Sequence, residues 1–255
     1  MSKQAKHPVR TSEKTLRIIE ALKRLDGAGV TELAREIDSG KSTVHNHLST
    51  LEEHRYVVKE GDTYRLGLKF LELGGYVRNR MALHRTAKPE ADRLAKETGE
   101  LANVATHEHG QCVYLYRSKS EDAVDLDTFA GFSTEMHNTA LGKSILAELP
   151  ESRVHEILDQ HGMAETTVHT ITDRGALFDE LERIREQGYA LDQEERVAGL
   201  RCVASPIKSP DGPVWGAVGV AGPTNRLRGE RFEETVPELV LSAANVIEIN
   251  LTYSD

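Results

Sequence analysis

A polar stretch near the N-terminus carries side chains suited to contacting nucleic acid. Between Lys41 and Ser49 the apolar residues fall on one side of a predicted helix, which leaves Ser42, His45 and Asn46 on the other. Hydroxyl groups at a helix start suit phosphate oxygens, because free N–H groups and the helix dipole favour an anion there. Asn can pair with adenine, and Lys or His can reach the acceptors of guanine. The stretch therefore indicates DNA contact, although an ordinary solvated helix face shows the same stripe.

Two cations on a predicted hairpin, Lys59 and Arg65, extend this candidate surface as contacts to the DNA backbone or minor groove. The full set of expected DNA contacts is Ser39, Lys41, Ser42, Thr43, His45, Asn46, Ser49, Lys59 and Arg65.

A second group of residues could bind a metal. His107 and His109 alternate along a predicted strand, and His137 and Cys202 complete a zinc ligand set if three segments converge. The chain has 11 histidines, so such spacings also arise by coincidence, and the sequence leaves the metal question open. Cys202 alone is typical of a small core residue.

The elements that position the DNA-contacting residues are three helices and a hairpin. Apolar spacing predicts helices from about residues 12 to 25, 31 to 37 and 41 to 54, and β-prone runs at 56–59 and 63–66 flank a Gly-Asp turn. A tight turn is expected at Asp38-Ser39-Gly40 before the third helix, and its glycine is able to take positive φ. Together these elements predict a winged helix-turn-helix whose last helix enters the major groove.

The rest of the chain alternates helices and strands in a pattern typical of an α+β sensor domain. A bent linker helix is expected at about 68–85. The further helices are expected near 87–98, 140–149, 151–160, 173–187 and 230–251, and the strands near 101–107, 111–117, 123–129, 189–192, 200–208 and 214–221.

Composition excludes several classes of protein. The net charge is −9, yet residues 1–75 hold 13 Lys+Arg against 11 Asp+Glu, so the acidity lies in the C-terminal part. No apolar run is long enough to span a bilayer, and the N-terminus lacks the apolar segment of a secretory signal. Two cysteines cannot form a disulfide scaffold. We expect a cytoplasmic protein without a membrane partner.

An ordered set of segments resembles the IclR-type transcriptional regulators over about residues 10 to 250. The segments that carry the resemblance are 31–35, 40–45, 64–67, 136–147, 188–195, 199–204 and 220–223. Each helix-turn-helix piece is common by itself, but the ordered set is specific.

The resemblance implies a winged helix-turn-helix at 10–67, a linker helix used in dimerisation at 68–85 and a GAF-like effector-binding domain at 86–255. It further implies a homodimer or tetramer, a double-stranded DNA operator, and a small organic acid or sugar-derived effector. By the same resemblance the effector pocket is lined by Ala140, Leu141, Asp192, Leu200, Cys202, Gly219 and Ala221.

The sequence departs from the family pattern in two respects. Asn46 stands where many relatives carry Arg, so the operator sequence cannot be transferred. Gly219 and Ala221 replace hydroxyl residues of some relatives, which favours an effector bulkier than a two- or three-carbon acid. We expect a ligand-responsive regulator of metabolic genes that is not an enzyme and needs no cofactor. The alternative is a metal-dependent sensor or an enzyme that uses the C-terminal domain.

Overall fold

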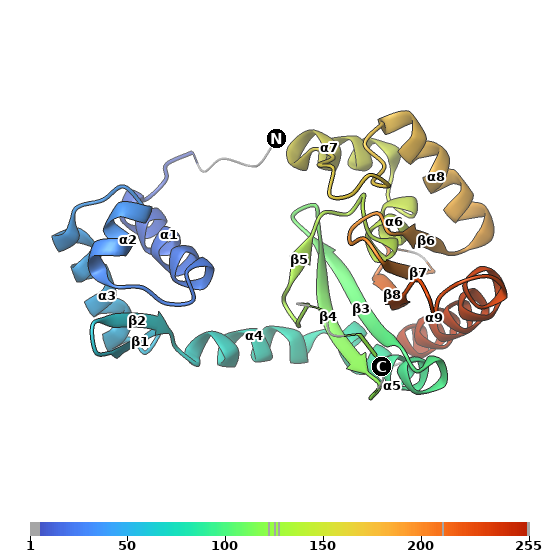
Figure 1. Cartoon of the computed structure of the whole chain (residues 1–255), viewed down its shortest axis with the longest axis horizontal. Helices are drawn as coiled ribbons and strands as arrows, with labels where there is room; N and C mark the ends of the chain where they lie inside the picture. Colours follow the sequence, from blue (N-terminus) through green and yellow to red (C-terminus); the bar gives the residue numbers. More distant parts are fainter. Residues whose placement is uncertain (1–5, 122, 125, 127, 211, 254–255) are drawn as a thin grey trace. The chain divides into compact units, whose positions relative to one another are not determined.

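The computed structural model describes residues 6–121, 123–124, 126, 128–210 and 212–253. These residues form two compact units, which divide between Val77 and Arg78. The first unit contains α1 (Arg10–Arg24), α2 (Val30–Glu36), α3 (Lys41–Glu53), β1 (Val57–Glu60) and β2 (Thr63–Leu66), shown in blue to teal in Figure 1. The predicted three helices and hairpin are therefore confirmed.

A single apolar core holds the first unit together. Ile18 and Leu22 from α1, Leu33 from α2, and Val44 and Leu48 from α3 are 0 to 1% exposed and pack in one cluster. The i, i+4 spacing of these residues places them on one side of each helix. Burial of this side leaves the opposite side of α3 facing solvent.

The tight turn between α2 and α3 does not use the positive φ that Gly40 could take. Asp38, rather than Gly40, takes the left-handed conformation, with φ 51°, while Gly40 has φ −66° and precedes the first residue of α3. The N–H of Ser39 donates to the carbonyl oxygen of Ala34 (2.9 Å), which closes α2. Aspartate tolerates this conformation better than most residues, so the glycine is not needed at that point.

The expected linker helix is shorter than predicted. α4 runs over Lys69–Arg80 and α5 over Ala82–Thr98, because Met81 between them is extended (φ −75°, ψ 118°). α4 buries no residue within the single chain, whereas α5 buries Leu83, Ala87 and Leu94 against the sheet of the second unit. The break therefore separates an unpacked helix from a packed one.

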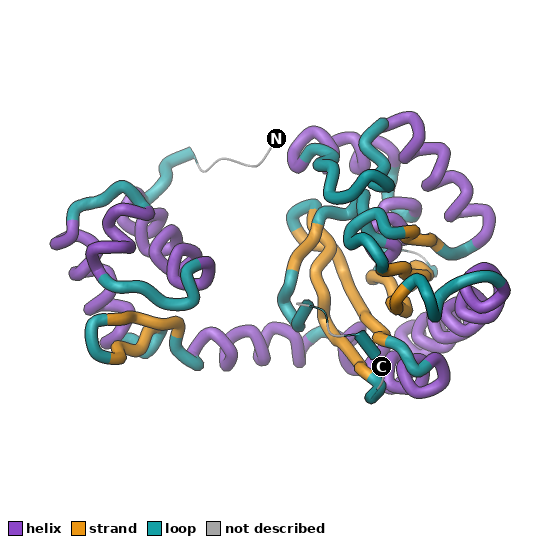
Figure 2. Tube along the Cα trace, in the orientation of Figure 1, coloured by secondary structure: helices purple, strands orange, loops and turns teal. Residues whose placement is uncertain are grey.

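The second unit is a six-stranded antiparallel sheet in the order β5-β4-β3-β8-β7-β6. The strands of this sheet are β3 (Leu101–Glu108), β4 (Gln111–Lys119), β5 (Ser133–Thr134), β6 (Ala190–Gln193), β7 (Leu200–Ile207) and β8 (Gly216–Pro223). Besides α5, the helical elements of the unit are α6 (Ala140–Ala147), α7 (Glu151–His161), α8 (Arg174–Gln187), a short π-helical turn (Arg231–Thr235) and α9 (Val236–Tyr253). α5 and α9 cover one face of the sheet, and α6, α7 and α8 cover the other (Figure 2).

The strand predicted at 123–129 is wrong for the residues that the structure describes. Asp125 and Asp127 lie outside the described residues, and the others in this range are not in a strand. Nη1 of Arg117 donates to the carbonyl oxygens of Leu126 (2.7 Å) and Thr128, so these carbonyls bond to a side chain instead of a neighbouring strand. In the described part of the chain, no helix is long and apolar enough to cross a membrane.

Candidate nucleic-acid interface and ligand cavity

α3 presents a continuous polar surface to solvent. Ser42, His45, Asn46 and Ser49 are exposed on the side opposite the core, as is Lys41 at the helix start. Thr43 and Ser39 are half-buried. The hydroxyl oxygen of Ser39 is buried without a hydrogen-bond partner among the described residues. The helix N-terminus has no side-chain cap, so its first N–H groups stay available to an anion.

The two predicted wing contacts lie on opposite faces of the hairpin. Lys59 pairs with Tyr64 and Arg65 with Val58, and successive residues of a strand point to opposite faces. The Lys59 ammonium lies 5.4 Å from the centre of the Tyr64 ring. Nε of Arg65 lies 3.5 Å from Oε2 of Glu60, on the solvent face. A carboxylate therefore already competes for the Arg65 guanidinium, while the Lys59 ammonium forms no ion pair within the described residues.

The second unit encloses a small cavity between its sheet and α6. About 20 Å³ is open to the centre of a water molecule, which is room for about one water. The lining residues are Asn103, Tyr114, Leu126, Thr128, Thr139, Leu141, Asp192, Arg196, Leu200, Cys202 and Ala221. A metabolite would have to displace some of these side chains to enter.

Five of the seven residues expected in the pocket line this cavity, namely Leu141, Asp192, Leu200, Cys202 and Ala221. Ala140 and Gly219 are instead enclosed by the surrounding core. A Cβ atom at Gly219 would lie 2.6 Å from the carbonyl oxygen of Val203 and 2.8 Å from Cβ of Ala204. The absence of a side chain at Gly219 is thus explained by close packing.

The cavity holds several polar groups with unmet bonding capacity. Burial, together with the nearby Glu195 carboxylate, raises the pKa of Asp192 to about 7. The oxygens Oδ1 of Asn103 and Oγ1 of Thr128 are buried, and neither has a hydrogen-bond partner in the described part of the chain. Buried polar atoms nearly always bond to something, so these groups mark a place for a polar ligand or water.

Arg196 is the cationic group of the cavity wall. It is half-buried, and its guanidinium carbon lies 5.3 Å from the centre of the Phe132 ring. Within the described residues it makes no ion pair or side-chain hydrogen bond. A guanidinium in this state can bind a carboxylate in a bidentate manner.

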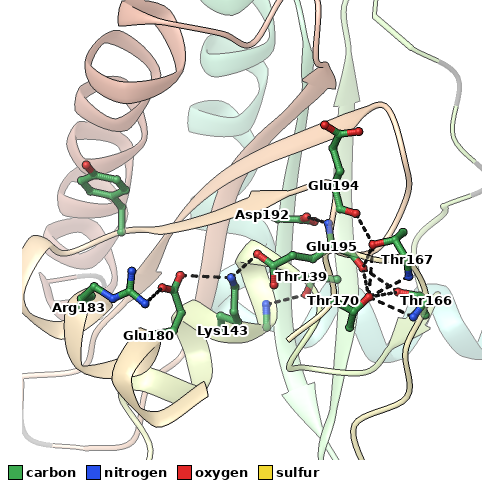
Figure 3. A network of polar contacts seen from close by, with 12 residues as sticks. Thr139, Lys143, Thr166, Thr167, Thr170, Glu180, Arg183, Asp192, Glu194 and Glu195 are labelled. Atoms are coloured by element: carbon green, nitrogen blue, oxygen red, sulfur yellow. Dashed lines mark hydrogen bonds and ion pairs between the residues drawn. The ribbon is translucent and has the colours of Figure 1, made fainter. Parts of the chain in front are cut away.

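A buried polar network next to the cavity joins α6, α8 and the loop that follows β6 (Figure 3). Nζ of Lys143 on α6 lies 2.6 Å from Oε1 of Glu195 and 3.3 Å from Oε1 of Glu180 on α8. The hydroxyl groups of Thr166 and Thr170 donate to the carbonyl oxygen of Glu195 at 2.8 and 2.6 Å. These contacts fix the loop that follows Asp192 of β6 and carries Arg196.

The sequence prediction missed the network and six lining residues: Asn103, Tyr114, Leu126, Thr128, Thr139 and Arg196. Only Lys143 left a signal, because a lysine inside the apolar run from Ala140 to Ala147 must be buried and therefore paired.

The predicted metal ligands do not form a site in the described residues, where no group of three or more His, Cys, Asp or Glu side chains is placed to hold an ion. His107 is the next-to-last residue of β3, whereas His109 lies in the following turn at φ 53°. The two imidazoles therefore do not alternate on one strand face.

Comparison with known proteins matches both units. The model "IclR helix-turn-helix domain" matches residues 11–61, and "Bacterial transcriptional regulator IclR C-terminal" matches residues 76–248. The chain is 36% identical over 238 residues to the "Probable HTH-type transcriptional regulator ArcR" of Halobacterium salinarum. That alignment covers 92% of this chain and 90% of that protein. It is 32% identical over 244 residues to the "HTH-type transcriptional regulator KdgR" of Escherichia coli, with 95% and 92% covered.

The fold is also similar to solved structures. The crystal structure of the Thermotoga maritima IclR aligns with a TM-score of 0.78 at 29% identity, covering 96% of this chain and 99% of that one.

Proposed function

The chain belongs to the IclR family of transcriptional regulators, and from that premise we propose that it binds operators of metabolic genes through α3 and the wing. The observation that carries this proposal is the exposed polar side of α3, with Ser42, Asn46 and Ser49 opposite a buried apolar side. A helix of this kind places hydrogen-bonding side chains against base edges in the major groove. The expected place of action is the cytoplasm, where chromosomal DNA is accessible.

The proposed ligand is a small organic acid or sugar-derived metabolite that binds in the cavity. Arg196 offers a partner for a carboxylate, and Asp192 and the amide oxygen of Asn103 offer acceptors for hydroxyl groups. Such a ligand changes operator affinity only as far as it binds the DNA-competent and DNA-incompetent states with different affinities.

The proposed assembly is a homodimer formed through α4. This helix buries nothing within one chain, and its apolar residues Leu71 and Val77 are 71% and 62% exposed. Exposed apolar side chains on one helix favour association with a second copy. A dimer would present two α3 helices to a two-fold-related operator.

The experiment that tests operator binding is recovery of genomic fragments on the purified protein at several salt concentrations. Enrichment of a few promoter fragments that share a two-fold-related sequence is the expected result. Uniform recovery of all fragments at every salt concentration, by protein that is folded, would contradict the proposal. Small organic acids added to the enriched fragments then identify those that change operator affinity.

A further inference from the structure

A groove runs between α1 and α3 of the first unit, with a volume of about 1070 Å³. Arg10, Lys14 and Arg17 line it from α1, and Thr43, Asn46 and Thr50 line it from α3. We propose that this groove binds the phosphate backbone that borders the major groove occupied by α3. The inference rests on the proposed operator binding and adds α1 to the DNA-contacting surface.

Continuity with the recognition surface supports this assignment. Thr43 and Asn46 line the groove and are also expected DNA contacts. A helix with its side chains is about 10–12 Å wide and fills a major groove of about 12 Å. The groove between α1 and α3 begins at Thr43 and Asn46, on the α1 side of the recognition surface. When α3 enters the major groove, the α1 side of the groove is therefore expected to face the phosphates that border it.

The charge of the groove matches a phosphate backbone. Among the described residues that line it, three are cationic and one, Glu13, is a carboxylate. Arg17 donates to the carbonyl oxygen of Ile37 (2.8 Å). Arg10 and Lys14 make no ion pair or side-chain hydrogen bond within the described residues. Two cations are thus free to pair with phosphates.

A side-chain hydrogen bond already joins α1 and α3 along the groove. Oγ1 of Thr15 on α1 lies 2.8 Å from Nδ1 of His47 on α3. Burial lowers the pKa of His47, and the charge of Lys14 lowers it further, so the imidazole is neutral at pH 7. The hydroxyl of Thr43 and the side-chain amide of Asn46 can donate to phosphate oxygens beside the cations. DNA would meet a preformed surface.

The test compares the full chain with the double variant Arg10→Gln/Lys14→Gln. Binding is measured on the recovered operator and on a random duplex of equal length, between 50 and 300 mM salt (roughly the range over which phosphate contacts are salt-sensitive). We expect binding to both duplexes to weaken about tenfold, and the slope of log K against log salt to fall by about 2. Lys23→Gln is the matched control, because Lys23 is an exposed cation near the other end of α1 and outside the groove.

A duplex in which single phosphates are replaced by uncharged groups shows which phosphate the groove contacts. A methylphosphonate in place of a phosphate at the edge of the α3 site should weaken duplex binding by the wild type. It should leave duplex binding by the double variant unchanged. Single Arg10→Gln, an exposed change at the start of α1, gives the same test if the double variant is unstable.

Two results would overturn the inference, and they are distinguishable. If the wild type prefers the operator and the double variant binds it with unchanged affinity and salt slope, the groove is not a DNA contact and the proposed function stands. If the folded wild type shows no preference for any duplex, the proposed function fails and the inference fails with it.

Discussion

The ammonium nitrogen of Lys143 lies 2.6 Å from Oε1 of Glu195, and neither side chain is more than 7% exposed. The pair joins α6 to the loop between β6 and β7 (Figure 3). In that loop the N–H of Glu195 donates to Oδ1 of Asp192 (2.7 Å), a cavity-lining residue. The position of the cavity wall therefore depends on a charge pair that does not itself line the cavity.

Replacing one partner of this pair should lower the free energy of unfolding of the second unit. Lys143→Met leaves the Glu195 carboxylate buried without its cation, which destabilises the second unit by about 3–5 kcal/mol. Urea unfolding followed by the fluorescence of Trp215, the single tryptophan, measures this change. Lys143→Met combined with Glu195→Leu should recover much of the loss, and Arg228→Gln, at an exposed residue outside this network, is the control. An unchanged midpoint for Lys143→Met would show that the pair contributes nothing.

Asp192 should make stability depend on pH. Its pKa in the folded state is raised to about 7, so the folded state holds the proton more tightly than the unfolded state. The stability that this provides is present at about pH 4 and is lost as pH rises to about 7. Asp192→Asn keeps an oxygen for the Glu195 N–H and carries no charge. Its Tm should rise above that of the wild type by a few degrees across this range, and a constant difference would refute the shift.

The control for Asp192 is Asp179→Asn, an exposed change on α8. Its Tm should follow that of the wild type at every pH.

The two wing cations should differ in their contribution to operator binding. Lys59→Gln is expected to lower the slope of log K against log salt by about 0.9, as for the loss of one phosphate contact. Arg65→Gln should lower it less, because the guanidinium already lies 3.5 Å from a Glu60 oxygen. Titrations of operator duplex at several salt concentrations compare the two variants. A larger loss for Arg65→Gln would reverse this ranking.

Arg196 should affect the ligand response without affecting DNA binding. Arg196→Gln removes the cation of the cavity wall and is expected to weaken binding of a carboxylate effector about tenfold or more. Operator affinity without effector should stay unchanged. The measurement is the shift of operator affinity by those acids that act on the wild type, with Arg228→Gln, at an exposed residue outside the cavity and its supporting network, as control. Equal responses of Arg196→Gln and wild type would exclude a contact between Arg196 and the effector.

The apolar side of α4 should control assembly. Leu71→Asp places a charge at a side chain that is 71% exposed in the single chain, so folding of each unit should be unaffected. Sedimentation equilibrium should show a dimer for the wild type and a monomer at micromolar concentration for the variant. Glu72→Gln, on the same helix, is the matched control. If both variants sediment as the wild type does, α4 is not the interface.

The sequence by itself determined the local elements of the first unit. Val44, Leu48 and Leu51 recur at helical spacing, so the buried side of α3 and its exposed side follow from the pattern alone. The hairpin followed from two β-prone runs around Gly61, whose φ of 61° suits glycine. Gly40 could take the left-handed conformation, but Asp38 takes it instead, and the sequence does not choose between such neighbouring candidates.

Only the tertiary structure decided how the cavity is built. Asn103, Tyr114, Cys202 and Ala221 come from four strands, and their meeting depends on strand order and register, which local spacing does not encode. In the range 123–129, expected as a strand, the carbonyls of Leu126 and Thr128 accept instead from the Arg117 side chain, a tertiary contact. Helical and strand periods are set by neighbours in sequence, whereas a binding site is set by residues far apart that folding brings together.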